Sequence, residues 1–155
     1  MSKTLVRLFI ALGAFLVLGG VNYSIYAKER IKNHGDVIYL RLAPVDPRSL
    51  MQGDYMALRF QIANEFPAQH TPDQRIPLQL DERRIATLGD PASTLRLRYR
   101  VRNNGIWIGT NAYFFEEGTA DRYAGARYGK FRVDLQTGEA VLVALCDEQF
   151  QELGR

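Results

Sequence analysis

The sequence predicts a mainly β protein, in which an N-terminal transmembrane helix precedes a small antiparallel β sandwich or partly open barrel with one short helix. Two observations support this prediction. Residues 8–27 contain no charged side chain, and a helix of this length spans roughly 30 Å, the hydrocarbon thickness of a bilayer. The remaining residues form short runs in which apolar and polar side chains alternate, separated by Pro, Gly and Asn.

Composition excludes several other classes of protein. The chain has 155 residues, of which 46% are apolar and 24% charged, so it is neither disordered nor fibrous and has room for one ordinary domain. Lys3 and Arg7 account for two of its 20 basic side chains, which leaves 18 basic against 17 acidic side chains in residues 28–155. A domain so balanced lacks the positive charge typical of nucleic-acid binding, and we expect no nucleic-acid partner.

The apolar segment divides the chain into residues 1–27, a transmembrane anchor, and residues 28–155, a β-rich domain. A cleaved signal peptide is the alternative, with residues 8–21 as its apolar region and cleavage after Ala27. A buried helix of a soluble fold is a third interpretation, less typical of 20 uncharged residues at a chain terminus.

Charge alone does not orient this segment in a membrane. Lys3, Arg7 and the terminal amine precede it, and three basic residues follow it closely (Lys28, Arg30 and Lys32). A short basic N-terminus before a single apolar span nevertheless favours an outward-facing domain.

The first half of the β-rich domain contains two predicted strands and one predicted helix. Residues 37–42 and 55–62 alternate in the manner of half-buried strands. Residues 64–77 contain three prolines and indicate a long loop. Residues 81–88 are predicted to form the short helix, with Asp81 in front and a glycine behind.

The second half is dominated by predicted hairpins. Residues 94–102 form the most regular alternation in the chain, with apolar residues on one face and arginines on the other. The Asn-Asn-Gly at 103–105 is a tight-turn signal, so the chain from Ile106 onward should fold back on that strand. Residues 128–134 and 140–146 should form a further hairpin around a Gln-Thr-Gly turn.

Residues 46–55, Asp-Pro-Arg-Ser-Leu-Met-Gln-Gly-Asp-Tyr, carry the strongest local signal for a binding loop. Proline fixes the backbone at its entry, and a glycine before the next strand permits a tight turn. Turn chemistry alone also explains a Gly-Asp pair, so a purely structural interpretation remains open. The candidate binding residues of this loop are Asp46, Arg48, Gly53, Asp54 and Tyr55.

Residues 53–60, Gly-Asp-Tyr-Met-Ala-Leu-Arg-Phe, resemble the motif that names the GDYxxLxY family of bacterial membrane-anchored proteins. Phe60 replaces the final tyrosine, which favours packing over a hydroxyl-dependent role there. The resemblance extends to Asp-Pro-Arg at 46–48, to Gly109 with residues 113–118, and to the hairpin at 127–134. It implies a helix in the bacterial inner membrane, an extracytoplasmic β-rich domain and a multi-pass membrane protein as companion, without an established biochemical activity.

A fainter similarity to membrane signal peptidases suggests a serine–lysine hydrolase. Those enzymes carry a serine shortly before a Pro…Gly-Asp segment, activated by a lysine further along the chain. Here Pro47 lies six residues before Gly53 rather than five, and the expected serine position falls on residue 44 or 45, which have no hydroxyl. Ser49 with Lys130 is the remaining catalytic alternative, since a desolvated lysine can act as a base.

The arginines of the 94–102 strand are a second candidate binding surface. Arg98 and Arg100 could meet anionic lipid headgroups or an acidic partner. They could equally form a solvated face paired across strands with acids such as Glu116 and Glu117.

We expect no metal and no cofactor. His34 and His70 lie far apart in the sequence, and adjacent glutamates on a strand point to opposite faces. The single cysteine, Cys146, ends an apolar run and is predicted to be a small buried hydrophobic residue.

Taken together, these features predict a membrane-anchored extracytoplasmic accessory domain without catalytic activity, which binds a multi-pass membrane protein through residues 46–55. A hydrolase and a module that binds anionic lipid or an envelope polymer are the alternatives.

Overall fold

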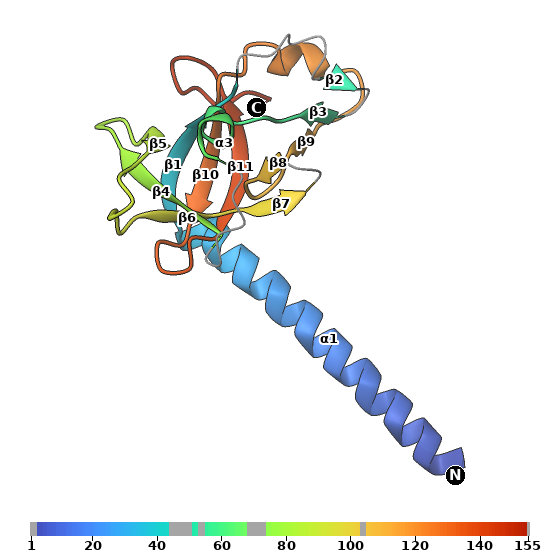
Figure 1. Ribbon diagram of the computed structural model, residues 1–155. Helices are drawn as coiled ribbons and strands as arrows, with labels where there is room; N and C mark the ends of the chain where they lie inside the picture. The colour runs from blue at the N-terminus through green and yellow to red at the C-terminus, as the bar shows by residue number, and fades with distance from the viewer. Residues whose placement is uncertain (1–2, 44–50, 53–54, 68–73, 103–104, 155) are drawn as a thin grey trace.

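The computed structural model describes residues 3–43, 51–52, 55–67, 74–102 and 105–154, and Figure 1 shows a long helix that leaves one end of a β-rich domain. Helix α1 runs from Lys3 to His34, and its 32 residues have a length of about 48 Å. The helix therefore continues seven residues beyond the uncharged segment. Ile31 is its buried residue and lies where α1 meets strands β10 (Tyr128–Val133) and β11 (Ala140–Cys146).

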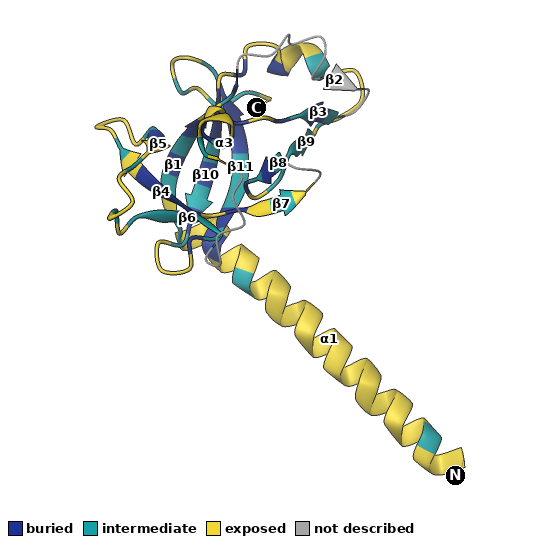
Figure 2. Cartoon of the chain, viewed as in Figure 1, coloured by how far each residue is buried: buried dark blue, intermediate teal, exposed yellow. Residues whose placement is uncertain are grey.

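The apolar part of α1 touches nothing else in the described chain. None of its most apolar window is buried, and Phe15, for example, is 76% exposed (Figure 2). Two of its polar side chains bond back to their own helix: the Asn22 amide donates to the Leu18 carbonyl at 2.8 Å, and the Ser24 hydroxyl donates to the Gly20 carbonyl at 3.0 Å. Such a helix is long and apolar enough to cross a membrane, and a helical backbone satisfies its hydrogen bonds internally.

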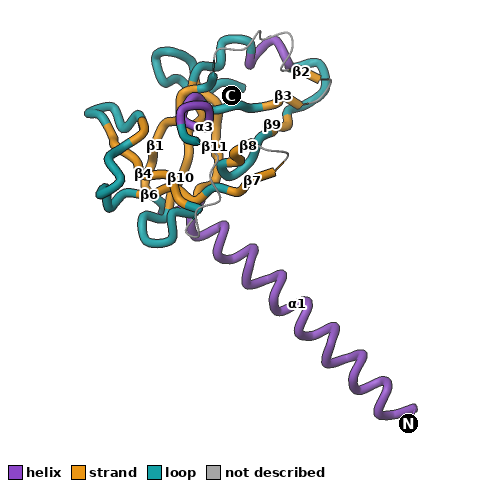
Figure 3. Tube along the Cα trace, viewed as in Figure 1, coloured by secondary structure: helices purple, strands orange, loops and turns teal. Residues whose placement is uncertain are grey.

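The described residues of the domain form open antiparallel sheets, as predicted, together with two short helical segments (Figure 3). Within each sheet, the hydrogen-bonded strands follow the order β1-β10-β11, β2-β3-β9, β5-β4-β6 or β7-β8. The strands are β1 (Asp36–Arg41), β2 (Met51–Gln52), β3 (Tyr55–Ala57), β4 (Arg75–Leu80), β5 (Ala86–Leu88), β6 (Arg96–Arg98), β7 (Arg100–Arg102), β8 (Gly105–Trp107), β9 (Ala112–Phe114), β10 (Tyr128–Val133) and β11 (Ala140–Cys146). The helical segments are α3 (Gln61–Glu65) and the 3₁₀ helix η1 (Ala120–Tyr123).

Individual backbone hydrogen bonds join these sheets at their edges. The Tyr39 N–H of β1 donates to the Arg84 carbonyl before β5 at 2.9 Å. The Arg98 N–H of β6 donates to the Gly138 carbonyl in the β10–β11 turn at 2.7 Å. The described sheets thus curve around one shared core without forming a continuous closed ladder.

The core is filled by the apolar faces of the predicted strands. Ile38, Leu40, Leu97 and Leu145 have no exposed surface, and the ring of Phe131 packs edge-on against Phe60 with centroids 5.2 Å apart. The predicted alternation at 37–42 and the 128–146 hairpin are confirmed by β1, β10 and β11. The hairpin predicted around residues 103–105 is confirmed by the pairing of β7 with β8.

The short helix predicted at 81–88 is wrong. The Asp81 carboxylate does accept backbone N–H groups, from Arg83 at 2.9 Å and Ile85 at 2.7 Å, as a helix cap would. The chain instead reverses there, with Arg84 in the left-handed region (φ 64°), and β5 pairs with β4. Part of β4 occupies the end of the predicted 64–77 loop, since Pro77 is buried in that strand.

Two predicted strands are shorter than expected. The strand predicted at 55–62 ends at Ala57, and α3 begins at Gln61, although all four residues of its apolar face are buried: Met56, Leu58, Phe60 and Ile62. The strand predicted at 94–102 divides at Tyr99, which is 1% exposed and donates its N–H to the Gln74 carbonyl at 2.9 Å. On either side of Tyr99 the chain pairs with a different sheet, β6 with β4 and β7 with β8.

Candidate binding site

The domain has a groove of about 650 Å³. It lies between the β3–β9 pair and the β7–β8 hairpin, with residues of α3 at one end. Its apolar lining includes Leu58, Phe60 and Ile106, which also belong to the core. The sequence places these side chains here because β3 and the segment after it turn alternate residues inward.

Asn111, a residue of the groove lining, has a buried side-chain oxygen without a hydrogen-bond partner. This oxygen, Oδ1, is the one such side-chain atom found among the described residues. The Asn111 backbone is well paired, since its carbonyl accepts the Leu58 N–H at 2.7 Å. An unpaired buried acceptor costs about 1–3 kcal/mol, so a bound group that donates a hydrogen bond would relieve that cost.

The charges that line the groove are positive. Arg59 is exposed on one side of it, and Arg102 lies over the Trp107 ring on the other, with its Cζ 5.3 Å from the ring centroid. No acidic side chain is among the described residues of the lining. The groove therefore combines an apolar floor with a cationic rim.

One predicted residue of the 46–55 loop contributes to this groove. Tyr55 lines it and packs against the Phe114 ring at 5.7 Å, and Phe114 is 74% exposed. An aromatic side chain exposed beside a groove is typical of surfaces that bind proteins. The other candidate residues of the loop, Asp46, Arg48, Ser49, Gly53 and Asp54, lie outside the described residues.

Arg98 and Arg100 lie in a second, smaller cavity of about 290 Å³. This cavity lies beside α1, which contributes one of its lining residues. Its lining also includes Lys28 of α1 and Glu139 at the start of β11. The structure thus brings two predicted binding residues together, but at a site separate from Tyr55.

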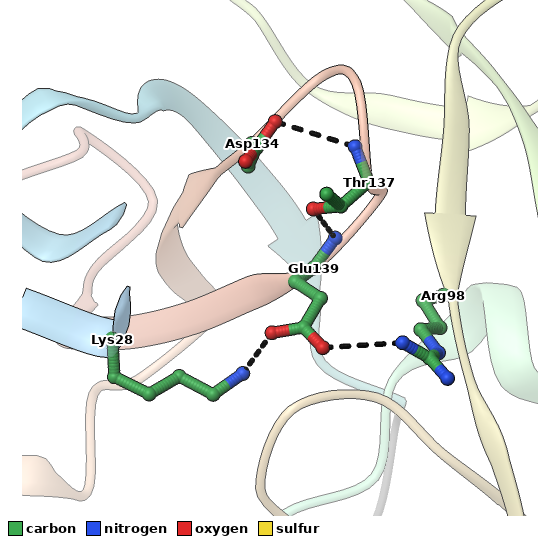
Figure 4. A network of polar contacts seen from close by, with 5 residues as sticks. All are labelled: Lys28, Arg98, Asp134, Thr137 and Glu139. Carbon is green, nitrogen blue, oxygen red and sulfur yellow. Dashed lines mark hydrogen bonds and ion pairs between the residues drawn. The ribbon is translucent and has the colours of Figure 1, made fainter. Parts of the chain in front are cut away.

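Glu139 connects the helix to the domain in this second cavity. Its carboxylate accepts hydrogen bonds from Lys28 on one side and from Arg98, at 3.2 Å, on the other (Figure 4). The hydrogen bond from Lys28 lowers the pKa of Glu139, assisted by the charges of Lys28, Arg98 and Arg100 and opposed by burial. Arg98 therefore pairs with Glu139 rather than with Glu116 or Glu117, the partners that strand pairing suggested.

The remaining chemical candidates have structural partners. Lys130 of β10 donates to the Glu152 carboxylate at 2.7 Å, an ion pair that would have to break before Lys130 could act as a base. Cys146 is fully buried, as predicted, and burial raises the pKa of its thiol. Within the described residues, no group of three or more His, Cys, Asp or Glu side chains could hold a metal ion.

Sequence reasoning did not identify Asn111, Trp107 or Glu139. Asn111 and Trp107 follow the Asn-Asn-Gly turn, and their place in the groove depends on how β8 pairs with β7 and β9 pairs with β3. Glu139 directly follows the Gln-Thr-Gly turn, but its partner Lys28 is 111 residues away in the sequence. No local pattern signals such pairings.

Comparison with known proteins gives a family match. A family model described as GDYXXLXY protein matches residues 17–145, from the second half of the apolar segment to β11. No curated protein and no solved structure matches the chain.

Proposed function

The chain belongs to the GDYXXLXY family, as its motif indicated, and from that premise we propose that it is a membrane-anchored accessory protein. In this proposal α1 holds the protein in the bacterial inner membrane as an uncleaved signal anchor. The β domain lies outside the cytoplasm, in the periplasm or beyond the cell, where it binds a multi-pass membrane protein without catalysing a reaction.

The exposed apolar surface of α1 supports the membrane part of this proposal. Its apolar side chains contact no other described residue, and so large an apolar surface in water would favour aggregation. Lys28 and Glu29 follow the apolar segment directly, and the helix then continues without interruption into its contacts with β10 and β11. A continuous helix across that boundary favours an anchor that stays attached to its domain.

The groove carries the binding part of the proposal. The family's motif contributes Tyr55, Leu58 and Phe60 to its lining, so the segment that defines the family is also the segment that shapes the groove. A structural motif would need only the buried pair, Leu58 and Phe60. The half-exposed Tyr55 and the unpaired Asn111 Oδ1 are better explained by a bound partner.

The lining indicates the chemistry of the partner segment. Arg59 and Arg102 favour an acidic residue, the apolar floor favours an aliphatic or aromatic side chain, and Asn111 Oδ1 accepts one hydrogen bond. An acidic extracytoplasmic loop of a multi-pass protein would meet all of these requirements.

Charge reversal in the groove tests this proposal. We expect Arg59→Glu to abolish co-purification of the membrane partner from detergent extracts, because it places a carboxylate opposite an acidic loop. Arg83→Glu is the matched control, since Arg83 is equally exposed but lies in the turn before β5, away from the groove. Retention of the partner by Arg59→Glu, or its loss from both variants, would contradict binding through the groove.

A reporter fused to the C-terminus tests the orientation. We expect a reporter that is active only outside the cytoplasm to be active in this fusion. Activity of a cytoplasmic reporter at the same position would contradict the proposed topology.

A further inference from the structure

The cavity beside α1 is separate from the groove, although the described lining of each carries a net positive charge. It is lined by residues of α1, of the β6–β7 segment and of the β10–β11 hairpin, and it shares only Trp107 and Thr110 with the groove. Its charged lining consists of Lys28, Arg98 and Arg100 against the single carboxylate of Glu139. With Glu139 ionised, the described lining has a net charge of +2, which favours an anion.

The cations keep donors available for such an anion. The side chains of Lys28 and Arg98 are 49% and 56% exposed, although both contact Glu139. Arg100 is exposed, and within the described chain its guanidinium makes no hydrogen bond. Guanidinium groups bind phosphate oxygens through two parallel N–H donors, so this pair of arginines suits a phosphate.

The position of the cavity identifies the source of the phosphate. Lys28 is the first residue after the uncharged segment, at the level where a helix leaves the hydrocarbon for the headgroup layer. Trp107 lies in the same lining, and indole rings favour that layer. A volume of about 290 Å³ is at the small end for ligand pockets and suits a headgroup rather than a whole lipid.

We propose that this cavity binds the phosphate of an anionic phospholipid headgroup in the leaflet from which α1 emerges, an inference that rests on the proposed membrane anchor. Glu139 holds Lys28 and Arg98 in position on its two sides (Figure 4), and Arg98 and Arg100 provide the contacts to the phosphate. The bound headgroup would then fix the domain close to the bilayer surface.

Trp107 provides a direct measurement, because it is the single tryptophan of the chain and lines the cavity. The full-length protein in neutral detergent is titrated with short-chain phosphatidylglycerol, short-chain phosphatidylcholine or inorganic phosphate at constant ionic strength, and Trp107 emission is recorded. We expect a saturable change with phosphatidylglycerol, a much weaker one with phosphate and none with phosphatidylcholine. Equal responses to the two lipids would overturn the proposal, and a response to phosphate as strong as that to phosphatidylglycerol would assign the site to a free anion instead.

Charge-removing variants locate the binding. Each basic side chain at an anionic membrane surface contributes about a factor of five in affinity, so we expect Arg100→Gln to bind phosphatidylglycerol about fivefold more weakly and the double variant Arg98→Gln/Arg100→Gln about thirtyfold more weakly. Arg83→Gln, the same change outside the cavity, should bind as the unmodified protein does. Because the Arg100 guanidinium makes no hydrogen bond within the described chain, the variant should fold normally, and unchanged affinity in Arg100→Gln would overturn the assignment.

Failure of this inference is distinguishable from failure of the proposed function. The titration contains no partner protein, so it does not depend on binding of the membrane partner in the groove. If α1 is not a membrane anchor, carbonate extraction will release the protein from membranes, whatever the titration shows. An integral protein that does not distinguish the two lipids would contradict the headgroup site alone.

Discussion

Replacing Gly138 with alanine should open the junction between β6 and the β10–β11 turn. Gly138 has a φ of 73°, and its carbonyl accepts the Arg98 N–H at 2.7 Å. A Cβ atom at this position would lie 2.7 Å from the Arg96 carbonyl oxygen and 3.1 Å from the Arg98 nitrogen. Both are backbone atoms, so the clash cannot be relieved by a side-chain rotation and must move β6 or the turn.

Gly118 provides the matched control for this change. It has nearly the same backbone conformation, with a φ of 77°, but a Cβ atom there would meet nothing within 4 Å. Alanine costs about 1–2 kcal/mol in the left-handed region at either position. At Gly138 the clash adds about 1–3 kcal/mol, and loss of the Arg98 hydrogen bond adds about 1 kcal/mol.

We therefore expect Gly118→Ala to lower the free energy of unfolding by about 1 kcal/mol and Gly138→Ala to lower it by at least about 3 kcal/mol. For a domain of this size, 1 kcal/mol corresponds to about 4 °C in Tm. Thermal unfolding of the full-length protein in one detergent, followed by circular dichroism, compares the two variants directly. Equal losses of Tm would refute the close approach of β6 to the β10–β11 turn.

Three further changes test other parts of the structure. Glu139→Gln should lower the free energy of unfolding by about 1 kcal/mol at neutral pH, because it removes two partly exposed ion pairs. The pKa of Glu139 in the folded protein lies below its ordinary value of 4.5, so the two ion pairs stabilise the protein above pH 4.5 and are lost as the pH falls through the folded pKa. Because Glu139→Gln lacks these pairs, its Tm should decrease less steeply than that of the unmodified protein below pH 4.5. Val17→Arg places a charge near the centre of the apolar segment at a cost of about 3 kcal/mol and should reduce the carbonate-resistant membrane fraction, whereas Leu135→Arg in the β10–β11 turn should not. Phe131→Ala should cost about 3–5 kcal/mol in urea unfolding, because Phe131 is fully buried against Phe60, and a loss under 1 kcal/mol would contradict that packing.

The sequence predicts those parts of the fold whose burial pattern is local. The uncharged segment at 8–27 predicts a long apolar helix, which is part of α1. The alternating runs at 37–42 and 128–146 correspond to β1, β10 and β11. Even where the strand at 55–62 ended early, the residues of its apolar face are buried, because burial follows the hydrophobic pattern more closely than backbone geometry does.

The errors arise where tertiary pairing decides between local alternatives. Asp81 accepts hydrogen bonds from the N–H groups that follow it in both a helix cap and a turn, and only the pairing of β5 with β4 selects the turn. The division at Tyr99 has the same origin, since the burial of its ring beside Phe66 coincides with the point at which the chain changes sheets.

In the candidate site, too, the sequence predicts the residues that a local pattern marks and misses those placed by contacts between distant segments. Tyr55, Arg98 and Arg100 could be selected from sequence, because a turn motif and an arginine stripe mark them. Contacts between distant segments of the chain place Tyr55 in the groove and Arg98 in the smaller cavity. The same kind of contact adds Asn111 to the groove and Glu139 to the cavity.

Site-specific photocrosslinking in intact membranes tests the central claim most directly, namely that the groove of a membrane-anchored domain binds a membrane protein. A photoreactive amino acid at Asn64, an exposed residue of α3 that lines the groove, is compared with the same amino acid at Gln79, which is exposed on β4 outside it. We expect an adduct with an integral membrane protein from position 64 and none from position 79. No adduct at position 64, or the same adduct from both positions, would contradict this claim.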